Sequence, residues 1–225
     1  YRHRIHSLRH HTSTVTYQPV EDYGIVGNLE TTALVGRDGS IDWCPLPHVE
    51  SPSVFARVLD DERGGYFSVG PTTSFESIQK YEERTNVLRT RFRTASGTAT
   101  VTDFMPVPEV AAAHRTTNQA LYRHVACAEG TIDLGVEFAP RFDYARAVPT
   151  IEPTEHGVAA TASGGGTEGS ETGDGTTGDG ETVYLSSTIP LDVEGDVAGT
   201  TTTLEAGDAG WLVLGYEHEV PADPG

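Results

Sequence analysis

The chain contains almost no lysine, only two cysteines and no long apolar run. Lys80 is the one lysine among 15 basic residues, against 33 acidic ones. Phosphate neutralisation needs clusters of Lys and Arg, so the composition argues against a nucleic-acid partner. No stretch approaches the roughly 18 consecutive apolar residues that suggest a membrane span. The sequence therefore predicts a protein with neither nucleic acid nor membrane among its partners.

The two cysteines, Cys44 and Cys127, show no CxxC spacing. Both lie in apolar, strand-like surroundings, where an unpaired cysteine usually behaves as a small buried hydrophobe. Such cysteines favour a cytoplasmic location. The sequence also has no zinc-type histidine spacing, no nucleophile elbow and no Walker loop, so we predict no metal site and no cofactor.

The formal net charge of -18 allows two interpretations. Carboxylates that replace lysine on the surface indicate a halophilic host, where molar salt shortens the screening length to roughly 3 Å. The other interpretation is an acidic patch that recruits a basic partner. The acidic residues are scattered along the chain, which favours the halophilic interpretation.

Short apolar runs alternate with turn signals along most of the chain. Asp38 and Gly39 stand between the β-forming runs Ala33–Val35 and Ile41–Cys44, and Asp-Gly in this setting is a strong hairpin signal. The run Ile132–Phe138 alternates apolar with polar residues, as a strand with one buried face does. Trp211–Tyr216 is apolar on both faces, which predicts a central strand.

These patterns predict an all-β fold, a large antiparallel β-sandwich (super-sandwich) with one short helix. The helix is expected to open with Ser51 and Pro52, which suit the N-cap and the first helical position. Val54, Phe55, Val58 and Leu59 would share one face, and Gly64-Gly65 would end the segment.

Two segments are expected to lie outside the regular structure. Residues 1–16 form a basic, His-rich stretch without apolar periodicity, which predicts a flexible arm. Residues 17–225 would then form the sandwich domain, interrupted by a disordered Gly/Thr/Asp-rich loop at about 163–181. We expect the strand-like runs on either side of this loop, Val158–Ala162 and Val183–Ser187, to pair with each other.

Several motifs follow one another at characteristic spacing: Glu21–Asn28, Ala33–Val35, Asp38–Trp43, Ser51–Ala56, Thr85–Thr90 and Asp103–Pro106, with later echoes at Pro140–Tyr144 and Ile189–Leu191. In this order and spacing they resemble the N-terminal domain of prokaryotic glycoside hydrolase family 15, the glucoamylase- and trehalase-like enzymes. One departure stands out: the family commonly has Arg-Phe-Asp-Ser where this chain has His48-Val49-Glu50-Ser51.

The resemblance implies a β-sandwich followed by an (α/α)6 barrel that carries the chemistry. In such inverting enzymes two barrel carboxylates, roughly 6.5–9.5 Å apart, protonate the glycosidic oxygen and activate water. This chain shows no helical half, so we predict no catalytic residue and no activity for the chain alone. The implied partners are the C-terminal barrel and an α-glucoside such as trehalose or an α-glucan.

Two groups of residues are candidates for the substrate rim or the domain interface. The first is the hairpin segment with Asp38, Ser40, Asp42 and Trp43, which either packs the core or reaches the sugar site of the barrel. The second is Arg141, Asp143 and Tyr144, an Arg–Asp pair beside an aromatic ring, which suits either a sugar contact or an internal ion pair. The alternative function is a free-standing carbohydrate-binding sandwich, against which both tryptophans, placed in apolar strands, argue.

Overall fold

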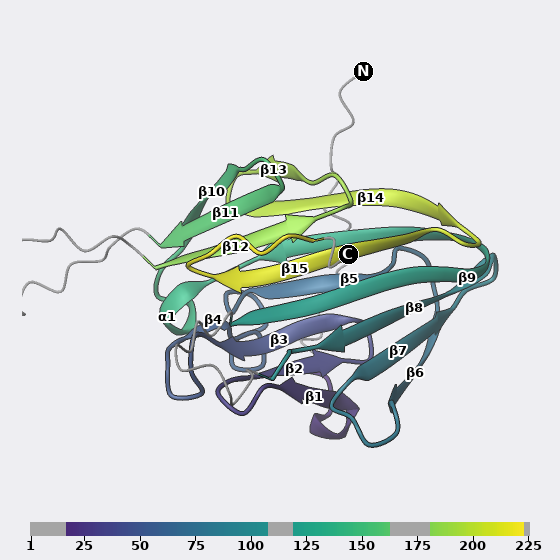
Figure 1. Ribbon diagram of the computed structural model, residues 1–225, viewed down its shortest axis with the longest axis horizontal. Coiled ribbons are helices and arrows are strands. Elements are labelled where there is room, and N and C mark those ends of the chain that lie inside the picture. Colours follow the sequence, from purple (N-terminus) through teal and green to yellow (C-terminus); the bar gives the residue numbers. More distant parts are fainter. Residues whose placement is uncertain (1–16, 108–118, 163–180, 223–225) are drawn as a thin grey trace, which may run out of the picture.

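The computed structural model describes residues 17–107, 119–162 and 181–222, and it is built almost entirely from antiparallel strands (Figure 1). The predicted arm at 1–16 and the predicted loop, apart from Glu181, lie outside the described residues. The predicted fold class, an all-β sandwich, is confirmed.

The strands form two layers, whose inner faces share one core. The first layer runs in the order β1 (Tyr23–Gly27), β2 (Thr32–Gly36), β3 (Ser40–Pro45), β5 (Tyr66–Pro71), β9 (Ala120–Ala139), β14 (Val197–Glu205) and β13 (Asp192–Glu194), with β4 (Ser53–Phe55) paired to the end of β3. The second layer runs in the order β6 (Glu76–Tyr81), β7 (Leu88–Arg93), β8 (Gly97–Phe104), β9, β15 (Ala209–Tyr216), β12 (Thr182–Ser187), β11 (Gly157–Ala162) and β10 (Pro149–Pro153).

The long strand β9 belongs to both layers and joins them (Figure 1). Its first half pairs with β8 and β15, and its second half pairs with β5 and β14. Gly130, with φ +68°, lies between the two halves, and a Cβ there would come within 2.1 Å of the Ser96 carbonyl. The bend in β9 therefore requires a glycine at this position.

Several sequence predictions are confirmed at the level of single strands. Ile132, Leu134, Val136 and Phe138 point inward and are buried. β15 is a central strand between β9 and β12, and β11 pairs with β12 across the undescribed loop. Both cysteines are free and buried, and burial raises the pKa of the Cys44 thiol to about 12. The inner core includes the rings of Phe55, Phe67 and Phe138, whose centroids lie 5.6–6.4 Å apart.

The helix predicted between Ser51 and Gly64 is wrong. Ser53, Val54 and Phe55 form strand β4 and are all fully buried, which a helix with one apolar face cannot achieve. Ser51 accepts a hydrogen bond from the His48 amide and closes a turn instead of capping a helix. The segment after Ala56 folds back in turns, because Ala56 N–H donates to the carbonyl of Gly64 at 2.7 Å.

Two short helical turns occur elsewhere in the described chain: the 3-10 turn η1 (Val20–Asp22) and α1 (Phe142–Ala145). In α1, Asp143, Tyr144 and Ala145 have φ of 49°, 56° and 67°, so this turn is left-handed rather than α-helical. No helix within the described residues is long and apolar enough to cross a bilayer.

Candidate functional site

The hairpin between β2 and β3 has the tight turn that its sequence predicts. Gly39 N–H donates to the Gly36 carbonyl at 3.0 Å, and Gly39 has φ +84°. A Cβ at Gly39 would lie 2.1 Å from the Val69 carbonyl, so no other residue fits. Asp38 accepts hydrogen bonds from the amide and the hydroxyl of Ser40, at 3.0 and 2.7 Å. These candidate residues thus stabilise their own turn.

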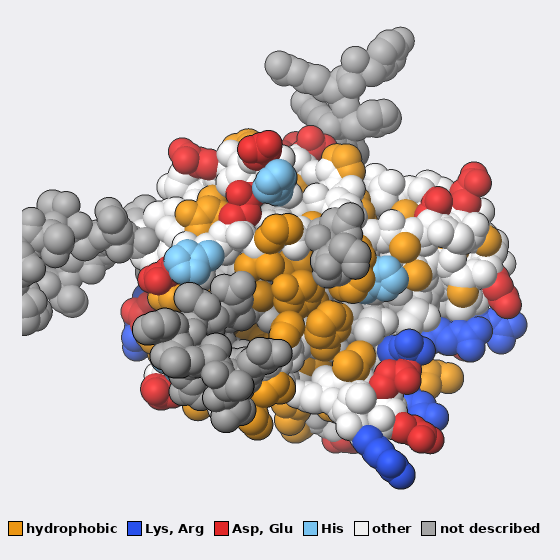
Figure 2. Space-filling model, in the orientation of Figure 1, with side chains coloured by type: hydrophobic (Ala, Val, Ile, Leu, Met, Phe, Trp, Pro, Cys, Tyr) orange, Lys and Arg blue, Asp and Glu red, His pale blue; other side chains and the backbone are white. Residues whose placement is uncertain are grey.

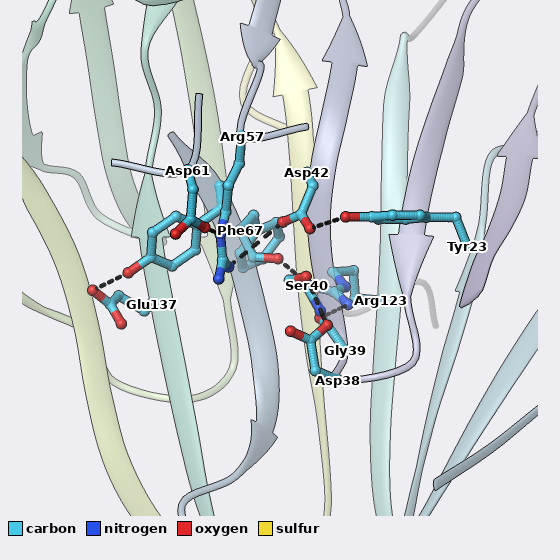
Figure 3. Close-up of polar contacts among 11 residues, drawn as sticks. Tyr23, Asp38, Gly39, Ser40, Asp42, Arg57, Asp61, Phe67, Arg123 and Glu137 are labelled. Carbon is cyan, nitrogen blue, oxygen red and sulfur yellow. Dashed lines mark hydrogen bonds and ion pairs between the residues drawn. The ribbon is translucent and has the colours of Figure 1, made fainter. Parts of the chain in front are cut away.

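A buried arginine from β9 holds this turn against the opposite layer (Figure 3). Arg123 is fully buried and donates to the Gly39 carbonyl at 2.6 Å, to the Phe67 carbonyl at 2.8 Å and to the Asp103 carboxylate at 2.8 Å. Its guanidinium also lies 4.8 Å from the centroid of the Phe67 ring. Burial raises the pKa of Asp103, and the charge of Arg123 opposes that shift. The pair links β8 and β9 to the hairpin.

Asp42 is the centre of a polar network on the outside of the first layer (Figure 3). Its carboxylate is buried, accepts a hydrogen bond from the Tyr23 hydroxyl at 2.7 Å and lies 3.6 Å from Nη1 of Arg57. Arg57 also pairs with Asp61 at 3.0 Å and lies 4.7 Å from the centroid of the Tyr66 ring. Burial raises the pKa of Asp42, and Arg57 and the Tyr23 hydrogen bond partly offset this. The network holds the turns after Ala56 against the sheet.

Trp43 brings the two candidate groups together. Its ring lies 6.0 Å from the ring of Tyr144, at an interplanar angle of 36°. Of the two alternatives left open for the second group, an ion pair between Arg141 and Asp143 does not form: Arg141 pairs with Asp196 at 2.6 Å, and Asp143 pairs with Arg146 at 3.3 Å. Trp43, Asp143 and Tyr144 therefore share one end of the sandwich, whereas Asp38, Ser40 and Asp42 belong to the separate networks described above.

An aromatic face on the outside of the second layer was not foreseen from the sequence (Figure 2). Phe104 of β8 stacks on Tyr122 of β9, with centroids 5.1 Å apart and planes within 10°. Trp211 of β15 contacts the rings of Phe104 and His124, at 6.3 and 4.4 Å. The rings pack against a small buried cluster of Ala120, Val213, Val220 and Ala222, each at most 8% exposed. Trp211 is only half-buried here, although its apolar strand argues for the interior.

Three residues of these networks, Tyr23, Arg57 and Arg123, were also missed by sequence reasoning. For Arg123 a signal existed, because it occupies an inward position between Leu121 and Val125, opposite the inward Asp103 of β8. A charged residue at a buried position of a strand needs an opposite charge nearby, and the neighbouring strand can supply it. No sequence spacing relates Tyr23 or Arg57 to Asp42. Within the described ranges, no three His, Cys, Asp or Glu side chains gather as metal ligands would.

Comparison with known proteins decides the family. A family model described as "Trehalase-like, N-terminal" matches residues 8–166. The chain belongs to the trehalase-like N-terminal family. The family resemblance drawn from the motifs is thereby confirmed.

Three trehalases illustrate how far the similarity extends. The trehalase of Thermoplasma volcanium is 32% identical over 203 residues, which cover 89% of this chain and 30% of that protein. The trehalases of Mycolicibacterium smegmatis and Mycobacterium tuberculosis are 30% and 27% identical, each over 91% of this chain and 31% of the relative. This trehalase-like N-terminal chain thus spans about a third of the length of the relatives it matches.

Proposed function

We propose that this chain is a non-catalytic N-terminal accessory domain of a longer glycosidase of trehalase type. The remainder of that protein would be an (α/α)6 catalytic domain, which cleaves an α-glucosidic bond and uses this sandwich to support the rim of its active site. The relatives named above are called trehalases, so trehalose is the first substrate to test.

The observation that carries the proposal is the aromatic face of the second layer. Its rings, Phe104, Tyr122 and Trp211, are partly exposed, whereas its aliphatic members are buried. Apolar surface gathered in one patch is typical of interaction sites. The last described residues, Val220 and Ala222, pack into this same face. A domain that follows them would therefore begin next to Trp211 and Tyr122, which are residue types that anchor protein interfaces.

The buried carboxylates fit a supporting role better than a catalytic one. Asp42 and Asp103 are the two acidic side chains that the described residues bury, and each is paired with an arginine. Both pairs belong to networks that join neighbouring segments of the sandwich. A general acid instead needs a carboxyl that can reach the glycosidic oxygen of the substrate.

Co-expression of this chain with the segment that follows it in the gene tests the proposal. We expect the two parts to co-purify and to release glucose from trehalose together, whereas this chain alone releases none. Replacing either Tyr122 or Trp211 with alanine should weaken the association by roughly 30-fold, since one buried aromatic anchor contributes about 2 kcal/mol or more. Alanine at Ile25 and Ile78, which are 53% and 71% exposed and lie outside the face, serves as the control. Glucose release by this chain alone, or an association insensitive to Tyr122 and Trp211, would overturn the proposal.

A further inference from the structure

Trp43 and Tyr144 form a small aromatic surface at one end of the sandwich. Trp43 is half-buried at the end of β3, and Tyr144 is 41% exposed in α1. Their centroids lie 6.0 Å apart at an angle of 36°, so the two rings meet in a tilted pair rather than a stacked one. The guanidinium of Arg146 lies 5.9 Å from the centroid of the Tyr144 ring. With 41% of its area exposed, Tyr144 remains accessible to a ligand beside Trp43 and Arg146.

The turn that presents Tyr144 has a conformation that side-chain-bearing residues rarely adopt. Asp143, Tyr144 and Ala145 are consecutive left-handed residues without a glycine among them. The ends of the turn are tied together by reciprocal backbone hydrogen bonds between Phe142 and Ala147, at 2.9 and 3.1 Å, and Phe142 is buried in the core. Such strain persists where the surrounding structure enforces it, and it is concentrated at ligand sites.

The charges around the pair indicate the kind of ligand. Asp143 and Arg146 are exposed and paired at 3.3 Å, so both can offer hydrogen bonds to hydroxyl groups. Glu181 and Glu217 lie near Asp143. Burial, and then the charges of Asp143 and Glu217, raise the pKa of Glu181 to about 7. This excess of carboxylates repels an anionic ligand. A neutral molecule with an apolar face and several hydroxyls fits both the rings and the charges.

We propose that Trp43 and Tyr144 stack against the ring of a neutral pyranose, with Asp143 and Arg146 hydrogen-bonded to its hydroxyls. The apolar C–H face of the sugar would lie on the exposed side of Tyr144. The choice of an α-glucoside over other neutral sugars rests on the proposed function. The stacking surface itself rests on the ring geometry and the left-handed turn.

Tryptophan fluorescence of the whole chain tests this proposal. Trp43 and Trp211 are the two tryptophans of the chain, so Trp211→Phe leaves Trp43 as the reporter. Titration of this variant with trehalose and with maltose, up to high millimolar concentration, should give a saturable change in emission. Adding Tyr144→Ala should weaken binding by about tenfold, as the loss of one ring contact would, whereas Tyr144→Phe should retain it.

The matched control is Tyr81→Ala, because Tyr81 is 42% exposed on β6, in the other half of the molecule. Circular dichroism confirms that each variant is folded. Absence of a saturable signal, or equal weakening by Tyr81→Ala and Tyr144→Ala, would overturn the proposal. Co-purification with the following segment probes the aromatic face instead, so failure of one proposal is distinguishable from failure of the other.

Discussion

Replacing Arg123 with methionine should be among the most destabilising single changes in this protein. The substitution keeps much of the side-chain volume but removes a buried cation with three partners: Asp103, the Phe67 carbonyl and the Gly39 carbonyl. Arg123 and Asp103 are both fully buried, so no water replaces the lost donor without rearrangement. The carboxylate of Asp103 then stays buried without a counter-charge.

The magnitude follows from these partners. Breaking a buried ion pair by removing one member costs about 3–5 kcal/mol. The Phe67 and Gly39 carbonyls each lose a hydrogen bond worth roughly 1 kcal/mol, although the Gly39 carbonyl keeps the one from Val69 N–H at 3.1 Å. Asp103→Asn should cost less, because burial already raises the pKa of Asp103 and a neutral amide avoids that penalty. In the double variant Arg123→Met/Asp103→Leu both charges are gone. We expect it to be more stable than Arg123→Met alone, since it leaves no unpaired buried charge and loses only the two hydrogen bonds from Arg123 to the Phe67 and Gly39 carbonyls.

Urea denaturation of the wild-type chain, the two single variants and the double variant measures these free energies of unfolding. Arg123→Lys is a milder probe, because an ammonium group cannot contact the three acceptors in the fork geometry of a guanidinium. Arg123→Lys should lose part of the wild-type stability. If Arg123→Met does not fold, Arg123→Lys should still do so. A loss below about 1 kcal/mol for Arg123→Met, or a double variant less stable than Arg123→Met, would refute the reasoning.

Three further predictions concern pH, backbone strain and salt. Burial and the charges of Asp143 and Glu217 raise the pKa of Glu181 to about 7, so the stability of the fold falls as the pH rises from about 4.5 to 7. The melting temperature of Glu181→Gln should therefore exceed that of the wild type at pH 8 and equal it at pH 4. A difference in melting temperature that stays constant with pH would contradict this. Gly39→Ala should lower the free energy of unfolding, measured by urea titration, by roughly 2–4 kcal/mol, because the new Cβ would lie 2.1 Å from the Val69 carbonyl. Gly207→Ala should cost less, because Gly207 has φ +100° but open space around it. The net charge of -18 predicts a melting temperature that rises between about 0.1 and 2 M KCl; a flat or falling profile would refute a halophilic surface.

Local patterns predicted much of the strand layout because alternation and turn residues act over a few neighbours. Asp38-Gly39 marks its hairpin, since only glycine fits the positive φ next to the Val69 carbonyl. The alternation in Ile132–Phe138 identifies the inward side chains of β9. The pairing of β11 with β12 was predicted from the strand-like runs on either side of the Gly-rich segment.

The same local reasoning failed where distant segments compete with it. Ser51 and Pro52 carry a helix-start signal, yet β3 offers Ser53–Phe55 a partner strand and full burial, and that tertiary gain exceeds the local preference. Local spacing also left open whether Arg141 pairs with Asp143. The structure gives them different partners, Asp196 and Arg146, and Asp196 lies 55 residues from Arg141 in the sequence.

The sequence by itself determined the all-β class, the family, the hairpin at Asp38-Gly39 and the alternation in Ile132–Phe138, because these depend on residues close together in the chain. Tertiary structure alone decided that Trp43 meets Tyr144, that Arg123 holds the hairpin turn at Gly39, and that Trp211 lies on an outer aromatic face. Each of these contacts joins strands far apart in sequence. Their geometry depends on how the two layers close over one core, and no periodicity within a single strand encodes it.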